Sequence, residues 1–158
     1  MEGKTVGESS FVLSKVMTQQ HTNPAGNVHG GIIAKLIDDA CGVVSYRHAR
    51  SNVVTASIDR IDFFGPVYVG DVLTVKASLN YVGKTSMEIG ARVEAESLVT
   101  GEIRHTASAY LTSVALDEQG SPKEIPPVLL QTEEEIRRHQ EAEARRVKRL
   151  AERKMQHV

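Results

Sequence analysis

The sequence predicts an α+β domain in which an antiparallel sheet curls around one long central helix. Three observations lead to this fold class: an apolar segment with helical spacing, alternating segments rich in β-branched residues after it, and short turns between those segments. Short turns join antiparallel neighbours. A helix whose surface is apolar on most sides must be buried, and here the sheet is expected to cover it. A chain of 158 residues fits one domain and can bury a full core.

The elements follow from periodicity. The central helix is expected at residues 30–46, where apolar residues recur at helical spacing: Ile33, Leu36, Ile37, Ala40, Val43 and Val44. His48 is placed after this helix. Strands are expected at residues 11–17, 53–64, 72–82, 85–95 and 103–116, separated by glycine- and proline-containing turns. In residues 85–95 the alternation puts Met87 and Ile89 on one face of the sheet and Glu88 and Arg92 on the other.

The C-terminal part of the chain is predicted to form a charged helix. Pro126 and Pro127 separate it from the sheet, so we divide the chain into a domain at residues 1–127 and a helical extension at residues 128–158. Acids precede bases by four positions, the favourable order on a helix, in the pairs Glu133/Arg137, Glu134/Arg138 and Glu141/Arg145. We interpret it as a solvated helix lying on the domain. The alternatives are an oligomer contact or a basic rim for a phosphorylated ligand.

Composition disfavours several classes of protein. The formal net charge of -1 gives no global attraction to nucleic acid or to an anionic membrane. No apolar run approaches the ~20 residues that span a bilayer, and the polar N-terminus has no signal-peptide pattern. We therefore expect a cytoplasmic protein without nucleic-acid or membrane partners. One cysteine, Cys41, and no zinc-type spacing of histidines mean that neither a metal nor a cofactor is expected.

The start of the central helix is the most informative segment. Asn23 stands in a turn-rich loop, and the helix begins with the pair Gly30 and Gly31. The first N–H groups of a helix have no partner within it, so they can bind a carbonyl oxygen or an oxyanion. The simpler alternative is that asparagine and glycine are present because the chain turns there, or because the helix packs closely on the sheet.

Asp38 is the second candidate. A carboxylate on a buried helix is costly unless it has partners or a task, although Asp38 or its neighbour Asp39 could be an ordinary solvated acid. Eight residues place Asp38 roughly 12 Å beyond Gly30 along the axis. A reacting carbonyl must lie ~3 Å from both its oxyanion donors and its base. One helix can hardly meet both demands, so we predict an obligate dimer with shared sites.

Other kinds of catalytic or binding site are less clearly indicated by the sequence. Cys41 lies in an apolar helix and is interpreted as core rather than as a nucleophile. His29 stands at the helix start, but no Gly-x-Ser-x-Gly elbow and no nucleotide-binding glycine loop occurs. Lys84, Thr85 and Ser86 follow a glycine between two strands. They suit a phosphate, or they form an ordinary hairpin turn.

Four blocks, in order, resemble the hotdog-fold acyl-CoA hydrolases, most closely the cytosolic brain-type and YciA-type thioesterases. The resemblance covers about residues 11–127. The blocks are Asn23-x-x-Gly26-x-Val28-His29-Gly30-Gly31-x6-Asp38, Val53-Val54-Thr55-x-Ser57-x-Asp59-Arg60-x-Asp62-Phe63, Pro66-x-x-Val69-Gly70-Asp71, and Val82-Gly83-Lys84-Thr85-Ser86-Met87-Glu88.

The resemblance implies a hotdog fold, a homodimer assembled into a trimer of dimers, and fatty acyl-CoA as substrate. It places the catalytic pair on Asn23 and Asp38, and the amides that face the thioester carbonyl on Gly30 and Gly31. The candidates for binding CoA are Lys84, Thr85 and Ser86, together with Ser57 and Arg60, whose roles stay unassigned.

The expected chemistry is thioester hydrolysis. Asp38 acts as a general base on water or as a nucleophile, and Asn23 orients the water or the carbonyl. Two alternatives stay open. One is an acyl-thioester hydratase or dehydratase of the same fold, for which His29 would supply the base, and the other is a non-catalytic acyl-CoA-binding module.

Overall fold

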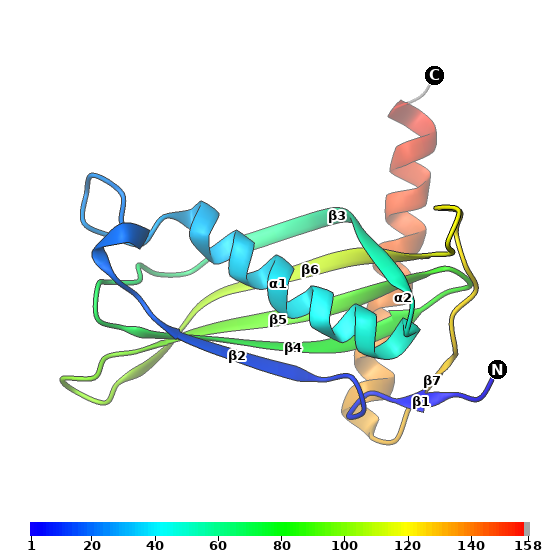
Figure 1. Ribbon diagram of the computed structural model, residues 1–158, viewed down its shortest axis with the longest axis horizontal. Coiled ribbons are helices and arrows are strands. Elements are labelled where there is room, and N and C mark those ends of the chain that lie inside the picture. Colours follow the sequence, from blue (N-terminus) through cyan, green and yellow to red (C-terminus); the bar gives the residue numbers. More distant parts are fainter. Residues whose placement is uncertain (157–158) are drawn as a thin grey trace.

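The computed structural model describes residues 1–156 (Figure 1). Its helices are the short 3₁₀ helix η1 (Gln19–His21), α1 (Gly30–Ala49) and α2 (Glu133–Gln156). Its strands are β1 (Lys4–Thr5), β2 (Phe11–Val16), β3 (Asn52–Phe63), β4 (Val72–Val82), β5 (Ser86–Glu96), β6 (Ile103–Leu116) and β7 (Val128–Leu129). The fold class predicted from the sequence, with its C-terminal charged helix, is confirmed. The division of the chain at residues 127 and 128 remains a prediction.

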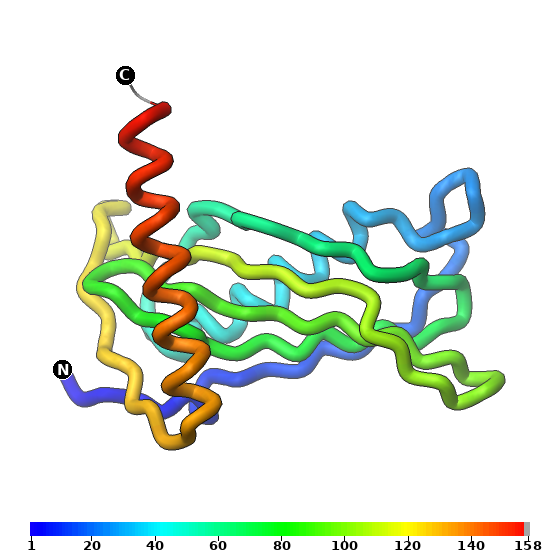
Figure 2. Tube along the Cα trace, turned by 180° about the vertical axis from the view of Figure 1, so that it is seen from behind, coloured from blue at the N-terminus to red at the C-terminus, as the bar shows by residue number. Residues whose placement is uncertain are grey.

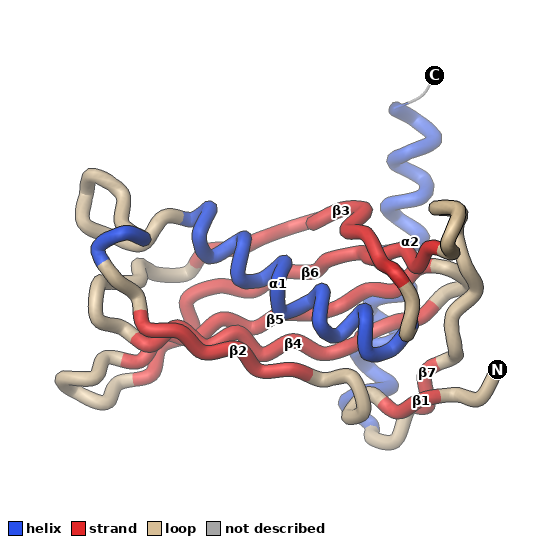
Figure 3. Tube along the Cα trace, in the orientation of Figure 1, coloured by secondary structure: helices blue, strands red, loops and turns tan. Residues whose placement is uncertain are grey.

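The main sheet has five antiparallel strands in the order β2-β4-β5-β6-β3. Helix α1 lies along one face of this sheet, while α2 crosses the opposite face (Figures 2 and 3). Strand β3 is therefore an edge strand, and three of its apolar side chains stay exposed: Val54 (44%), Ile58 (38%) and Phe63 (52%). Exposed apolar edges of this length favour pairing with another chain. Among the described residues, no helix is long and apolar enough to cross a membrane.

The core forms between α1 and the inner face of the sheet. Alternate residues of β5 point inward, as the sequence pattern predicted, and Met87, Ile89 and Val93 are fully buried. They pack against the apolar side of α1, where Ile37 and Val44 are also fully buried. Burial of such side chains contributes roughly 1.5–3 kcal/mol each. This core holds α1 rigidly against the sheet.

The end of α1 differs from the prediction. The helix continues to Ala49, so His48 lies inside it rather than after it. Arg50 ends the helix in the left-handed conformation, with φ 50°, and its N–H donates to the carbonyl of Tyr46. A non-glycine residue in this conformation is uncommon, which is why the sequence did not mark the true end.

Helix α2 makes different contacts from those that its charge pattern predicted. Arg138 pairs with Glu134 as expected, but Arg137 pairs with Glu141 at 3.2 Å rather than with Glu133. Arg145 does not pair with Glu141. It reaches to the sheet and binds Glu88 with two hydrogen bonds of 2.9 and 2.8 Å. The helix thus docks on the sheet, and Ala142 is buried in the contact.

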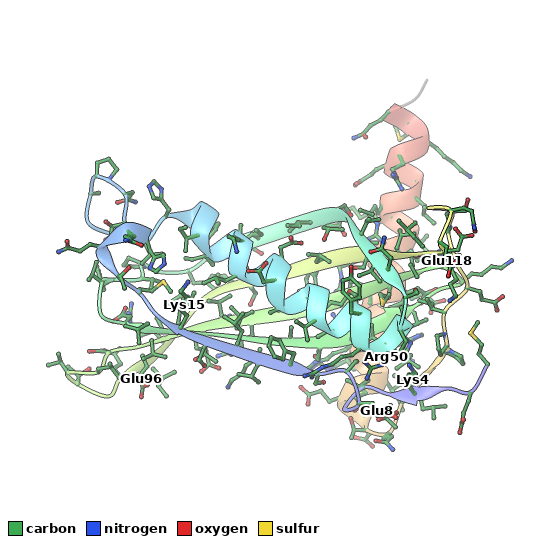
Figure 4. The ribbon with its side chains drawn as sticks, in the orientation of Figure 1. Lys4, Glu8, Lys15, Arg50, Glu96 and Glu118 are labelled. Atoms are coloured by element: carbon green, nitrogen blue, oxygen red, sulfur yellow. The ribbon has the colours of Figure 1, made fainter. Side chains whose placement is uncertain are left out.

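The two ends of the domain meet beside the end of α1. Strand β1 pairs with β7, and Lys4 Nζ donates to the carbonyl of His48 at 2.8 Å. Lys4 and Glu8 lie next to this end of the helix, near Arg50 (Figure 4). His48 is fully buried and its Nε2 donates to the carbonyl of Pro126 at 2.7 Å, while its Nδ1 has no partner within residues 1–156. A carbonyl only accepts, so Nε2 carries a proton, and burial lowers the pKa of the ring, which favours the neutral form.

Because the neutral form of His48 is favoured in the folded protein, we expect the stability of the fold to decrease in mild acid. Burial lowers the pKa of His48, helped by the charge of Lys4 and opposed by the bond to Pro126 and the charge of Glu8. The unfolded chain therefore binds the proton more readily than the folded one. The contribution is fully present above the ordinary histidine pKa of about 6.5 and is lost as the pH falls through the lower folded-state pKa.

The measurement is the free energy of unfolding in urea between pH 8 and pH 5, for the natural protein and for His48→Gln. The natural protein should lose more stability over this range than the variant does. Parallel pH profiles for the two proteins would contradict the assignment.

Candidate active site

The loop before α1 is shaped by Asn23. Its backbone N–H donates to the carbonyl of Asn27 at 2.7 Å, and its side-chain Oδ1 accepts from the N–H groups of Ala25 (3.0 Å) and Asn27 (3.2 Å). Gly26 has φ 89°, which glycine adopts without strain. The oxygen of the Asn23 amide is thus committed to the loop. Its Nδ2 makes no hydrogen bond within residues 1–156 and is available to a ligand.

The start of α1 is open. Helix residues Gly30 and Gly31 follow His29, whose side chain does not cap the helix. The N–H groups of Gly30 and Gly31 have no acceptor in the described part of the chain. The carbonyl of His29 accepts hydrogen bonds from the N–H groups of Ile32 and Ile33, the next two residues of the helix. A side chain at Gly31 would meet nothing within 4 Å, and at Gly30 only the ring of Phe63 at 3.5 Å. Close packing on the sheet therefore does not explain these glycines.

Asp38 and Asp39 differ in their surroundings. Asp38 is half-buried, and its Oδ1 accepts a hydrogen bond of 2.7 Å from the hydroxyl of Thr55 on β3. Asp39 is exposed and forms a surface ion pair with Lys35 at 2.9 Å. Only Asp38 faces the edge strand, so it is the carboxylate that the fold holds in a fixed position.

Thr55 is the residue that sequence reasoning missed. It stands in the second of the four motif blocks, but nothing in the sequence indicates that it meets Asp38, 17 positions away. A shift of register lies between Thr55 and Ser57, which marks a β-bulge at Ala56. The bulge turns Thr55 toward α1 and Ser57 toward α2, where Ser57 donates to Asp59 at 3.0 Å.

The five predicted CoA-binding residues divide into two groups. Ser57 and Ser86 line one cavity of about 280 Å³ between the outer face of the sheet and α2, which we call the α2 pocket. Arg60 instead pairs with Asp62 at 2.9 Å on the surface, away from this cavity. Lys84 and Thr85 stand in the turn between β4 and β5 and do not line it either. The structure brings together only the two serines.

Cys41 has the properties of a core residue. It is fully buried, and burial, with a smaller effect of the Asp38 charge, raises the pKa of its thiol to about 12. A thiol with this pKa is protonated at neutral pH and is a poor nucleophile. Within residues 1–156, no group of three or more His, Cys, Asp and Glu side chains gathers as a metal site would require.

Comparison with known proteins places the chain among thioester hydrolases. The thioesterase superfamily matches residues 25–102. The acyl-CoA thioester hydrolase YkhA of Bacillus subtilis is 38% identical over 147 residues, which are 93% of this chain and 83% of the relative. A hexameric acyl-CoA thioesterase superposes with a TM-score of 0.92 at 38% identity, over 96% of this chain and 97% of that one.

The acyl-CoA hydrolase of Staphylococcus aureus, solved with butyryl-CoA, CoA and CoA disulfide, superposes with a TM-score of 0.89 at 32% identity, over 97% of this chain and 93% of that one. Further structures of the same hydrolase carry alanine in place of one aspartate, one asparagine or one threonine.

A sheet wrapped around one helix, together with these relatives, places the chain in the class of hotdog-fold domains that hydrolyse thioesters. This chain belongs to the acyl-CoA thioester hydrolases of the thioesterase superfamily. It spans about 40% of the length of the mouse and rat cytosolic acyl-CoA thioester hydrolases that it matches at 34% identity.

Proposed function

We propose that the protein hydrolyses fatty acyl-CoA to a fatty acid and CoA at a site built on Asp38. The observation that carries the proposal is the 2.7 Å hydrogen bond from Thr55, which fixes the Asp38 carboxylate on a helix whose first N–H groups are open. A half-buried carboxylate held in one orientation suits a general base or a nucleophile.

The spacing of residues in the S. aureus hydrolase supports this assignment. The asparagine, aspartate and threonine replaced there stand 15 and then 17 positions apart along the chain. Asn23, Asp38 and Thr55 follow the same order with the same spacing, from 23 to 38 and from 38 to 55. Residues chosen for replacement in a relative therefore coincide with the three polar residues singled out by geometry here.

The chemistry follows from these groups. The carbonyl oxygen of the thioester accepts hydrogen bonds from Gly30 and Gly31, which also stabilise the oxyanion of the tetrahedral intermediate. Asp38 takes a proton from water while the water oxygen bonds to the carbonyl carbon, and Nδ2 of Asn23 orients the water or the carbonyl. The C–S bond then breaks, and the CoA sulfur takes up the proton. Direct attack by Asp38 would instead give an anhydride that water hydrolyses.

The proposed site needs two subunits. Asp38 lies roughly 12 Å along α1 from Gly30, so the amides and the carboxylate of one chain do not reach the same carbonyl. The exposed apolar residues of edge strand β3 supply a surface for a second copy, since Val54 adjoins Thr55, which binds Asp38, while the ring of Phe63 lies near Gly30. We propose a homodimer in which each site combines the helix start of one subunit with Asp38 of its partner. The hexameric thioesterase relative supports further assembly into a trimer of dimers.

Hydrolysis by this route uses water and protein groups, so we propose that no cofactor is needed beyond the CoA of the substrate. The mouse relative is named a cytosolic hydrolase, which supports a cytoplasmic location.

Thr55→Val should reduce turnover with little change in stability. The substitution keeps the shape of the side chain but removes the hydroxyl that holds Asp38, so the carboxylate becomes free to rotate. A fall in kcat of about tenfold is expected, the scale of one hydrogen bond to a charged group. Thr55→Ser retains the hydroxyl and is the matched control. Equal kcat values for the two variants would show that this bond does not position the carboxylate.

The direct test of the function is the release of CoA thiol, followed with a thiol reagent, from short, medium and long acyl-CoA substrates. Thiol release that depends on enzyme concentration would support hydrolysis. Tight binding of CoA without thiol release would favour the binding module. Addition of water to an enoyl-CoA without thiol release would favour the hydratase, and His29→Ala would then abolish the reaction.

A further inference from the structure

The α2 pocket contains arginines that the proposed reaction does not use. Arg146, Arg149 and Arg153 follow one another along one face of α2 and form a wall of the cavity. Two acids, Asp59 and Glu152, also line it, so the pocket keeps a formal charge of +1 from three bases and two acids. Asp59 is already occupied, because it pairs with Arg149 at 2.6 Å.

The other two arginines have no acidic partner. Neither Arg146 nor Arg153 forms an ion pair with any residue in the range 1–156, although Arg146 lies 5.8 Å from the centre of the Tyr81 ring. A second, larger cavity of about 540 Å³ on the same face of the sheet is different. Every basic residue that lines it has an acidic partner: Lys76 and Arg92 with Glu94, Arg137 with Glu141, Arg138 with Glu134, and Arg145 with Glu88. Of these two cavities, the α2 pocket alone has lining arginines without an acidic partner among residues 1–156.

The floor of the α2 pocket carries hydroxyl groups. Ser57 comes from β3, Ser86 from β5 and Thr112 from β6. Thr112 is only 7% exposed, yet its hydroxyl has no hydrogen-bond partner within the described residues. A buried hydroxyl without a partner is costly, so its presence beside two unpaired arginines indicates a missing acceptor. A phosphate group has the charge and the oxygens to meet all of these donors.

We infer that the α2 pocket binds phosphate groups at the nucleotide end of the CoA substrate, through Arg146 and Arg153. This inference rests on the proposed function. It is supported by the position of the pocket beside the strand that holds the catalytic carboxylate. Ser57 stands two residues from Thr55, roughly 7 Å along β3, and the bulge at Ala56 directs the two side chains to opposite faces of the sheet.

With this assignment, helix α2 contributes to binding of the substrate. The arginine guanidinium binds phosphate oxygens with paired N–H groups, and its charge persists at every physiological pH. The thioester is neutral, so the phosphates are the only charged groups of this substrate that the protein can bind. Residues far from the reacting carbon would then contribute substrate affinity without taking part in bond breaking.

The test compares Arg146→Ala/Arg153→Ala with the natural protein on two substrates, butyryl-CoA and butyryl-pantetheine, which lacks all phosphates. Lys148→Ala is the matched control, because it removes an exposed positive charge from the same helix outside the pocket. We expect the double variant to raise KM for butyryl-CoA about tenfold at unchanged kcat, on the scale of a charged hydrogen bond. KM for butyryl-pantetheine should equal that of the natural protein.

Calorimetry with CoA, 3′-dephospho-CoA, pantetheine and inorganic phosphate gives a readout that does not need turnover. Weaker CoA binding by the double variant, with unchanged pantetheine binding, would support the inference even if no thiol were released. An unchanged affinity for CoA, or an equal loss for CoA and pantetheine, would overturn it. Arginine-dependent binding of inorganic phosphate without arginine-dependent binding of CoA would also overturn it, since the pocket would then serve a separate anion.

Discussion

Asp38→Asn is expected to lower kcat by about 100- to 10,000-fold, the usual contribution of a general base. The amide has the same shape as the carboxylate and still accepts the hydrogen bond from Thr55, but it cannot take a proton from water or attack a carbonyl. The fold should be unaffected, because Asp38 is half-buried and forms no ion pair within residues 1–156. Thiol release under saturating acyl-CoA measures the loss.

Asp39→Asn is a control from the next position in the chain. Its partner is Lys35 in an exposed pair, and such pairs contribute about 0–1 kcal/mol to stability. The variant removes the same charge from the same helix without touching the proposed site, so its kcat should match that of the natural protein. Near-normal turnover by Asp38→Asn, or an equal defect in Asp39→Asn, would exclude Asp38 as the reacting carboxylate.

The fold could be predicted because its strands and its central helix each have a clear period. Alternation in β5 comes from one buried face, and every inward residue from Met87 to Ala95 is apolar. Strands β4 and β6 begin and end where the sequence placed them, since turn residues border both. The end of α1 was missed because Arg50 occupies a conformation that usually requires glycine or asparagine.

The site was only partly predictable because its contacts join distant segments. Asp38 could be named from its place on an apolar helix, but its partner Thr55 depends on how β3 passes α1. The bulge at Ala56 places Thr55 and Ser57 on opposite faces of the sheet, although they stand two positions apart, and an alternation pattern cannot reveal this. The contact between Arg145 and Glu88 was missed for the same reason: a local rule pairs Arg145 with Glu141, whereas the buried carboxylate of β5 attracts it more strongly.

Arg145→Ala should release α2 from the sheet. Glu88 is 2% exposed and accepts two hydrogen bonds from Arg145, with a third of 3.1 Å from Asn80. These bonds hold the pKa of the arginine above its ordinary value, and its guanidinium also lies 3.7 Å from the centre of the Tyr110 ring. Removing one partner of a buried pair typically costs about 3–5 kcal/mol, because the other charge remains buried and unpaired.

Detachment of α2 is the expected response, since it lets water reach Glu88 while the core between α1 and the sheet stays intact. Limited trypsin digestion should cut the basic residues of α2 much faster in Arg145→Ala than in the natural protein. Arg138→Ala loses only an exposed pair with Glu134 and should resist digestion like the natural protein. Adding Glu88→Gln to Arg145→Ala should restore part of the protection, because it removes the unpaired charge.

The same variant connects the docking of α2 with substrate binding. Arg145 stands next to Arg146 on α2 but points to Glu88 rather than into the α2 pocket. If phosphate binding requires a docked helix, Arg145→Ala should raise KM for butyryl-CoA and leave KM for butyryl-pantetheine unchanged, although it removes no residue that lines the α2 pocket. A rise in both KM values would mean that α2 supports the fold of the active site as a whole. Unchanged KM values with rapid digestion would mean that substrate binding does not use α2.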